Sequence, residues 1–351
     1  MKALEFIKLK QKVWAEKYIK KQNENNENKT HLVSGTLING KEANNSQEYF
    51  EEIKYNLFPI KDDKDINEYG LREINNVAYS KGSGNEIIDK IEKKEENKTI
   101  TTRAKMKAVF SSSAIVVNLF QYWQKKEDIT PLLKALGFEF KREIEEIIFE
   151  SKNQITGMRG FPPHLDVIIT TNANNFAIES KFTEPYTEKR DKNSKERGKN
   201  SEIQHSYIAD KKKTLWENSP NLENLAQAIH SPNALIENEE IKEEIKELIK
   251  KLRKTNHLDA SQLIKHILGL RTVNEKISKD KKITLLYLWY DVPGTEEAVE
   301  HQEEIEAFAS IAKADGINFR HITYQEVIFN LKENYYDEHK DYIDYLVERY
   351  L

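Results

Sequence analysis

The stretch that most constrains this chain runs from Phe161 to Lys181 and reads FPPHLDVIITTNANNFAIESK. Two apolar runs, LDVIITT and FAIESK, are separated by TNANN, whose asparagines tolerate the left-handed backbone that a reversing chain needs. The pattern predicts a β-hairpin. Because side chains alternate across a strand, Glu179 and Lys181 should share one face of the second strand with Ala177.

Three charged residues fall at one end of this hairpin. Asp166 lies near the start of the first strand, and Glu179 and Lys181 lie near the end of the second. Ionised groups close to a buried sheet are costly unless they are paired or bind a metal, and two carboxylates with an ammonium suit a hard divalent cation and a phosphate. Asp166 and Glu179 are therefore predicted metal ligands, with the carbonyl oxygen of Ser180 as a third. In the hydrolysis of a phosphodiester, Lys181 would orient the attacking water or help to deprotonate it, and would stabilise the negative charge that develops on the phosphate.

Composition narrows the class of protein. The 351 residues are 32% charged and include no cysteine, so carboxylates and imidazoles are the strong side-chain metal ligands that remain. No apolar run approaches the roughly 18 residues of a membrane span, and the first residues lack an apolar signal core, so we expect a cytoplasmic protein without membrane contact. The net charge of -4 argues against binding nucleic acid by bulk electrostatics alone, but allows a local basic surface.

The rest of the chain predicts an α/β domain with a mixed sheet. An amphipathic helix over residues 2 to 22 should carry Phe6, Leu9, Val13 and Trp14 on its apolar side. A short helix is expected over residues 85 to 93. Further strands are predicted at 143–151, 281–292 and 318–324, and further helices at 111–123, 237–254, 258–270, 301–314 and the tyrosine-rich stretch up to residue 351.

The predicted helix at 258–270 divides into two faces. Leu263, Ile264, Ile267 and Leu268 form an apolar stripe that we expect to be buried, and Gln262, Lys265, His266 and Gly269 follow another face at spacings of three and four. A lone histidine is more often a structural group than a ligand, so we interpret Lys265 and His266 as structural and Gln262 as functional.

The hairpin resembles the PD-(D/E)XK superfamily of metal-dependent nucleases. Pro163-His164-Leu165-Asp166 corresponds loosely to the PD element, with two residues inserted, and Glu179-Ser180-Lys181 matches ExK. Six blocks in order resemble, more narrowly, a largely uncharacterised bacterial family of restriction endonucleases: GSGNEI, KMKAVFSSSAIVVNLFQYW, GMRGFPPHLDV, AIESKFTEPY, LDASQLIKHILGL and LLYLWYDV. This likeness runs from about Gly82 to the C-terminus and leaves out the first 80 residues or so.

The resemblance implies a restriction-endonuclease-like core, in which a mixed central sheet is flanked by helices, and a site for Mg²⁺, with Mn²⁺ as an alternative. Superfamily members often add an acid from the first core helix, which would be Glu86 in a GxxxE pattern. Glu150, on the strand before the hairpin, is the alternative. We prefer Glu86. A glutamine often lines such sites too, and Gln262 fits by position if residues 183–257 are an insertion, although Gln204 is nearer in sequence.

Two further residues are candidate substrate contacts. Arg159, between two glycines beside the hairpin, could reach a phosphate, and His164 is close to Asp166. The predicted organisation is an N-terminal accessory region at 1–80 and a PD-(D/E)XK nuclease-like domain at 81–351, with a helical insertion at about 183–257.

These observations predict a metal-dependent endonuclease that hydrolyses DNA, in restriction or phage defence. The partners expected are DNA, a second copy of the chain in a homodimer, and other proteins of a defence system. Two alternatives stay open: a module that keeps the nuclease fold but only binds nucleic acid or a partner, and a nuclease that acts on RNA or structured DNA. Sequence specificity cannot be inferred, because base contacts depend on loop geometry.

Overall fold

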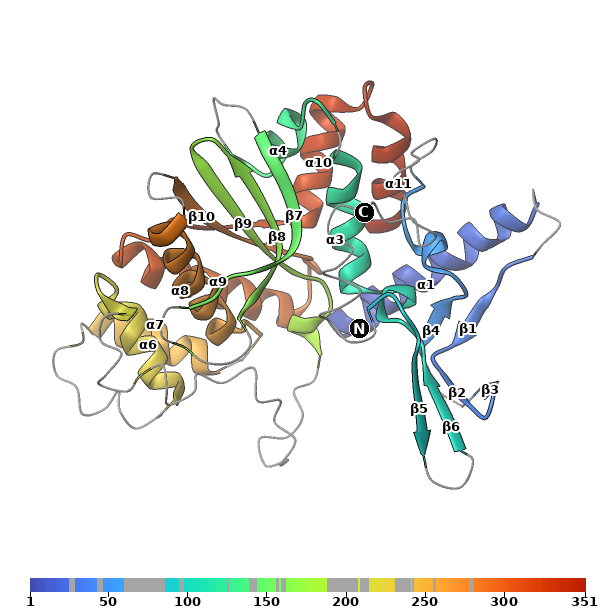
Figure 1. Cartoon of the computed structure of the whole chain (residues 1–351), viewed down its shortest axis with the longest axis horizontal. Helices are drawn as coiled ribbons and strands as arrows, with labels where there is room; N and C mark the ends of the chain where they lie inside the picture. Colours follow the sequence, from blue (N-terminus) through green and yellow to red (C-terminus); the bar gives the residue numbers. More distant parts are fainter. Residues whose placement is uncertain are drawn as a thin grey trace.

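The chain folds into a mixed α/β structure in which helices cover both faces of a central sheet (Figure 1). This computed structural model describes residues 1–24, 29–42, 47–59, 86–94, 98–124, 126–138, 144–155, 158, 162–187, 208, 215–230, 241, 243–254, 257–277 and 281–351. Among them, no helix is both long and apolar enough to cross a membrane.

The central sheet has five strands in the order β11-β10-β9-β8-β7. Their bounds are β7 (Ile144–Lys152), β8 (His164–Thr171), β9 (Asn174–Lys181), β10 (Lys282–Trp289) and β11 (Phe319–Thr323). Strands β7, β8 and β9 pair antiparallel, whereas β10 runs parallel to both β9 and β11. The predicted hairpin and the predicted mixed sheet are therefore confirmed, and β10 is apolar on both sides because helices cover both of its faces.

Each face of this sheet contributes to its own apolar core. In β9, Ile178 packs into one core and the neighbouring Ala177 packs into the other, as alternation requires. The core around Ile178 includes helices α1 (Ala3–Glu24), α3 (Ser112–Phe120), α4 (Thr130–Ala135), α10 (Tyr324–Tyr335) and α11 (Lys340–Tyr350). The core around Ala177 includes helices α6 (Pro220–His230), α7 (Glu243–Lys254), α8 (Ala260–Ile277) and α9 (Glu296–Ala314).

Helix α1 forms where we expected it, but it presents a different face to the core. Phe6, Leu9 and Val13 are 39%, 52% and 42% exposed, so three of the four residues predicted to be apolar contacts point outward. Buried instead, along with Trp14, is Gln11, whose side chain bonds to Arg349 of α11. The same buried face carries Ala3, Ile7, Ala15 and Ile19 at helical spacing, so the prediction had chosen a neighbouring stripe of the helix.

The helix expected over residues 85–93 is wrong. Its described part ends in strand β5 (Lys90–Lys94), which pairs with β6 (Lys98–Thr102) in a second sheet of order β3-β2-β6-β5. Strands β2 (Thr36–Ile38) and β3 (Lys41–Glu42) complete this sheet, which projects from the body in Figure 1. Backbone pairing with β6 outweighed the weak helical pattern, since strand preference depends on the neighbouring strand.

The remaining short elements connect these layers. Strand β1 (Leu32–Ser34) pairs with β4 (Glu48–Phe50), and short 3-10 helices include η1 (Ile53–Asn56), η2 (Lys105–Lys107), η3 (Gln121–Trp123) and η4 (Glu184–Tyr186). The predicted division at residue 80 and the predicted insertion at 183–257 stay predictions. Helix α1 does share an apolar core with α10 and α11, and helices α6 and α7 lie within the predicted insertion.

Candidate active site

The three charged residues of the hairpin come together at the end of β9. The Nζ atom of Lys181 donates a hydrogen bond to Oε1 of Glu179 at 2.6 Å. Regular pairing between β8 and β9 ends at Val167 and Ile178, and beyond it the backbone N–H of Ser180 donates to Oδ2 of Asp166 at 2.7 Å. The Asp166 carboxylate therefore serves in place of a backbone partner at the point where the two strands separate.

Burial and mutual charge shift the protonation of these groups. Burial by itself raises the pKa of Glu179, but Lys181 and His266 together lower it to about 2. Burial and the neighbouring Glu179 carboxylate raise the pKa of Asp166 well above its ordinary value. Burial opposes the charge of Lys181, but Glu179 and Asp166 raise its pKa overall, so its side chain is an ammonium. The cluster holds more carboxylates than ammonium groups, and a further cation close to Asp166 would lower its pKa again.

Glu150 joins the same cluster from β7. It lies between the paired residues Phe149 and Ser151, which places it opposite Asp166, and its backbone has a φ of 52°. A positive φ is uncommon for residues other than glycine and is often found at functional positions. Burial, followed by the charges of Glu86 and Glu179, raises the pKa of Glu150 to about 7. The carboxyl of Glu150 is therefore close to half protonated at neutral pH.

The two competing acids have different surroundings. Glu86 is 7% exposed and already has two partners, the Nζ of Lys105 at 2.7 Å and the hydroxyl of Ser113 at 2.8 Å. The Oε2 of Glu150 lies 3.5 Å from Nδ1 of His164. The geometry brings Glu150 and His164 to the cluster and gives Glu86 a separate ion pair at its border. The identity of the fourth member of the site stays a prediction. Gly82, Arg159 and Gln204 lie outside the described residues.

Helix α8 lies over the cluster with its polar stripe. The Oε1 of Gln262 accepts a hydrogen bond from Nζ of Lys181 at 2.9 Å, so the structure places Gln262 where we predicted it. One turn later, Nε2 of His266 lies 2.9 Å from Oε2 of Glu179. His266 is the contact that we had interpreted as structural, and its place on the same stripe as Gln262 was the available signal.

The donor set fits a divalent cation. The Oε2 atom of Glu179 is buried beside Nε2 of His266, and a carboxylate oxygen has a second lone pair that can bind a cation. Within the same residues, no group of three or more histidine or acidic side chains is already arranged around a common point. Mg²⁺ is usually held by only one or two carboxylates, with water and phosphate oxygens completing its shell, so Asp166 and Glu179 are an adequate protein contribution. The hydroxyl of Ser180 faces Tyr324, 2.6 Å away, and only its carbonyl is a candidate ligand.

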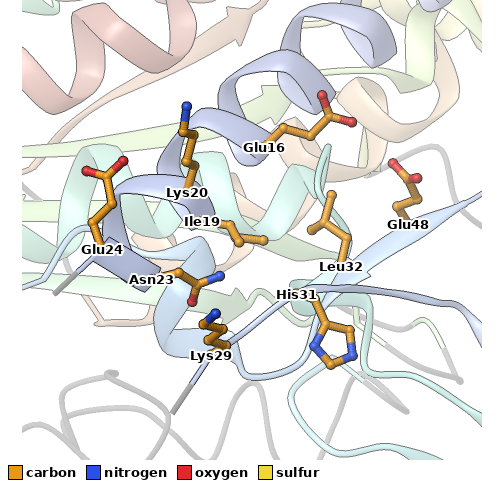
Figure 2. Close-up of a pocket in the computed structure, with 9 residues that line it drawn as sticks. All are labelled: Glu16, Ile19, Lys20, Asn23, Glu24, Lys29, His31, Leu32 and Glu48. Carbon is orange, nitrogen blue, oxygen red and sulfur yellow. The ribbon is translucent and has the colours of Figure 1, made fainter. Parts of the chain in front are cut away.

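A separate surface hollow of about 550 Å³ lies beside the last turns of α1 (Figure 2). Residues of both signs line it, among them Lys20, Lys29 and Glu48. None of the predicted site residues lines this hollow. Its mixed charge does not favour a phosphate or a metal.

Comparisons with known proteins give one match. The model of a protein family described as Restriction Endonuclease associating with ARP matches residues 41–351. This range begins well before Gly82, where we had placed the start of the likeness, so it also takes in part of the predicted accessory region. No curated protein and no solved structure matches the chain.

Proposed function

This chain belongs to the family described as Restriction Endonuclease associating with ARP, and from that premise we propose that it is a metal-dependent endonuclease that hydrolyses the phosphodiester bonds of DNA. The observation that carries the proposal is the meeting of Asp166, Glu179 and Lys181 at the end of the β8–β9 hairpin. We assign the sheet and its helices to the restriction-endonuclease-like core of the PD-(D/E)XK superfamily.

In this mechanism Asp166 and Glu179 hold Mg²⁺ or Mn²⁺, with the carbonyl oxygen of Ser180 as a third ligand. When bound, the cation neutralises the phosphate and makes water a better nucleophile. The raised pKa of Lys181 favours two of its predicted roles, which are to orient the water and to stabilise the negative charge that develops on the phosphate. The hydrogen bond to Gln262 fixes the direction of the ammonium.

Glu150 is the better candidate for the fourth member of the site. It lies opposite Asp166, whereas Glu86 is already bonded to Lys105 and Ser113. With a pKa of about 7, Glu150 can also accept a proton at neutral pH. We therefore place Glu150 ahead of Glu86, and His164 beside it as a candidate substrate contact.

The test is cleavage of DNA by the purified chain with Mg²⁺ or Mn²⁺. Lys181→Ala and Asp166→Asn should each abolish cutting and retain the circular dichroism spectrum of the wild type. Lys340→Ala is the matched control, because Lys340 is an exposed lysine that pairs with Asp344 on α11. Full cleavage by both site variants would contradict the assignment of Asp166 and Lys181 to the active site.

A second candidate is a module that binds nucleic acid or a partner without catalysis. The observation in its favour is that Lys181 already neutralises Oε1 of Glu179. Titration with Mn²⁺ separates the two candidates, since a binding module has no need of a cation at these carboxylates. A substrate panel of duplex, single-stranded and branched DNA and of RNA would define the nucleic acid.

The family description also bears on partners. It names an association with ARP, so we propose that the chain works together with such a protein, in restriction or phage defence. A homodimer would bring two sites to the two strands of a duplex. Sedimentation of the chain alone, and then with ARP, would measure both associations.

A further inference from the structure

The polar stripe of α8 follows the charged residues of β9 in order. Gln262 bonds to Lys181, and His266, one turn further along, lies 2.9 Å from Glu179. We propose that His266 is a positioning residue that holds the Glu179 carboxylate ready for the metal. This inference rests on the proposed function, because it assigns His266 a role at the same metal site.

The surroundings of His266 are polar at one nitrogen only. Its side chain is 0% exposed, and Nδ1 has no hydrogen-bond partner among the described residues. Burying a polar group without such a bond is costly. The Nε2 atom lies 2.9 Å from the buried Oε2 of Glu179, and this contact contributes to the lowered pKa of Glu179. The main polar contact of this buried histidine is therefore with a predicted metal ligand.

The contact completes a clamp on the carboxylate. Lys181 holds Oε1 of Glu179 from within the strand, and His266 borders Oε2 from the helix above. A carboxylate confined at both oxygens keeps one orientation, so little freedom remains to be lost when a cation binds. Groups that orient metal ligands from outside typically change metal affinity by about 10- to 100-fold when they are removed.

Gly269 allows α8 to pack closely against the edge of the sheet. A Cβ at Gly269 would lie 2.7 Å from the backbone oxygen of Asn153 and 3.0 Å from its Cβ, which is too close for any side chain. Asn153 directly follows β7, so the helix approaches the edge of the sheet one turn beyond His266. The absence of a side chain at Gly269 thus allows His266 to reach Glu179.

The experiment compares Mn²⁺ affinity, measured by isothermal titration calorimetry, between His266→Gln and His266→Met. Both side chains are unbranched and similar in length, but only glutamine presents an N–H donor near the position of the histidine Nε2. We expect His266→Met to bind Mn²⁺ about 10- to 100-fold more weakly than the wild type, and His266→Gln to recover most of that loss. Thermal unfolding of each variant shows that the comparison is made on folded protein.

Each outcome of this experiment either supports or overturns the proposed role of His266. If His266→Met binds Mn²⁺ as tightly as the wild type, or if His266→Gln is as weak as His266→Met, the inference is overturned. A ¹⁴N coupling in the pulsed EPR spectrum of Mn²⁺ bound to the wild type would also overturn it, because His266 would then be a ligand. If the wild type binds no Mn²⁺ at all, the proposed function fails first and this inference with it.

A third variant tests the same idea without changing any group near the metal. Gly269→Ala should push α8 away from Asn153 and weaken Mn²⁺ binding, with the ligands and His266 intact. It also serves if His266→Met does not fold. Wild-type affinity in Gly269→Ala would overturn the claim that the close approach of α8 positions His266.

Discussion

Two regions of this protein bury charge, and they treat it in opposite ways. The guanidinium of Arg349 is 1% exposed, and all five of its N–H donors are used. Its acceptors are the side-chain oxygens of Gln11, Asn56 and Tyr345 and the backbone oxygens of Asn56 and Val109. The ring of Trp14 lies 4.2 Å from the guanidinium carbon, a favourable cation–π contact.

The carboxylate cluster is the reverse case. Glu150, Asp166 and Glu179 lie around the ammonium of Lys181, and burial together with neighbouring carboxylates raises the pKa of Glu150 and Asp166. Arg349 ties together segments from both ends of the chain and needs nothing more. The cluster still attracts positive charge, which is expected of a place that receives a cation. Satisfied buried charge therefore indicates a role in folding, and unsatisfied buried charge indicates a role in chemistry.

The largest effect should come from removing the Lys181 ammonium, which bonds to Glu179. Lys181→Met should lower the cleavage rate by about 10³-fold, because the developing negative charge loses its nearest side-chain cation. It should also cost less stability than removing Arg349, since the partly exposed Asp166 leaves water access to the cluster. Single-turnover cleavage and urea unfolding measure the two quantities. A larger loss of stability than in Arg349→Met would break the comparison.

Arg349→Met should lower the free energy of unfolding by about 3 kcal/mol, because several buried acceptors lose their donor. Cleavage per folded molecule should stay at the wild-type level. Arg320→Met is the control: the Arg320 guanidinium donates to the carbonyl of Gly137 from an exposed position, so its loss should matter much less. A cleavage defect in folded Arg349→Met would place Arg349 in the chemistry.

Glu150→Gln should change the pH dependence of stability. The pKa of Glu150 is about 7 in the folded chain, above its ordinary value of 4.5, so between these two values the folded state keeps a proton that the unfolded state has released. Wild-type stability should therefore fall as pH rises through this window, and Glu150→Gln should lack that fall. Relative to the wild type, the variant should gain about 2 kcal/mol between pH 5 and pH 8 in urea unfolding. A constant difference would show that Glu150 is not perturbed.

The smallest effect concerns the other side of β9. Tyr324→Phe removes the hydroxyl that lies 2.6 Å from the hydroxyl of Ser180. We expect a loss of about 1 kcal/mol in the free energy of unfolding and no change in cleavage, because this contact lies in the satisfied part of the core. A reduced cleavage rate in the folded variant would show that the contact of the Ser180 hydroxyl also positions the Ser180 carbonyl, the predicted metal ligand.

What could be predicted from the sequence was local. The alternation in LDVIITT and FAIESK gave the hairpin and its two faces, and the spacing along α8 brought out Gln262 and His266 on one stripe. Both patterns depend on residues a few positions apart. The mixed sheet followed from the order and hydrophobicity of the later strands.

What could not be predicted depends on distant partners. The burial of the polar Gln11 in α1 depends on its bond to Arg349, and the two residues are 338 positions apart. Strand β5 exists because β6 pairs with it. The contact of His266 with Glu179 requires α8 to approach Asn153 at Gly269. None of these approaches leaves a periodic trace in the sequence.

The order of β9 and β10 has a consequence during synthesis. β9 leaves the ribosome before α6, α7 and α8, and its parallel partner β10 follows all of them. Until then β9 is an open edge, and such edges recruit strands from other unfolded chains. Glu179 and Lys181 lie at its end, where charge discourages that pairing. We therefore expect the residues that we assign to phosphodiester cleavage also to discourage such pairing by the nascent hairpin.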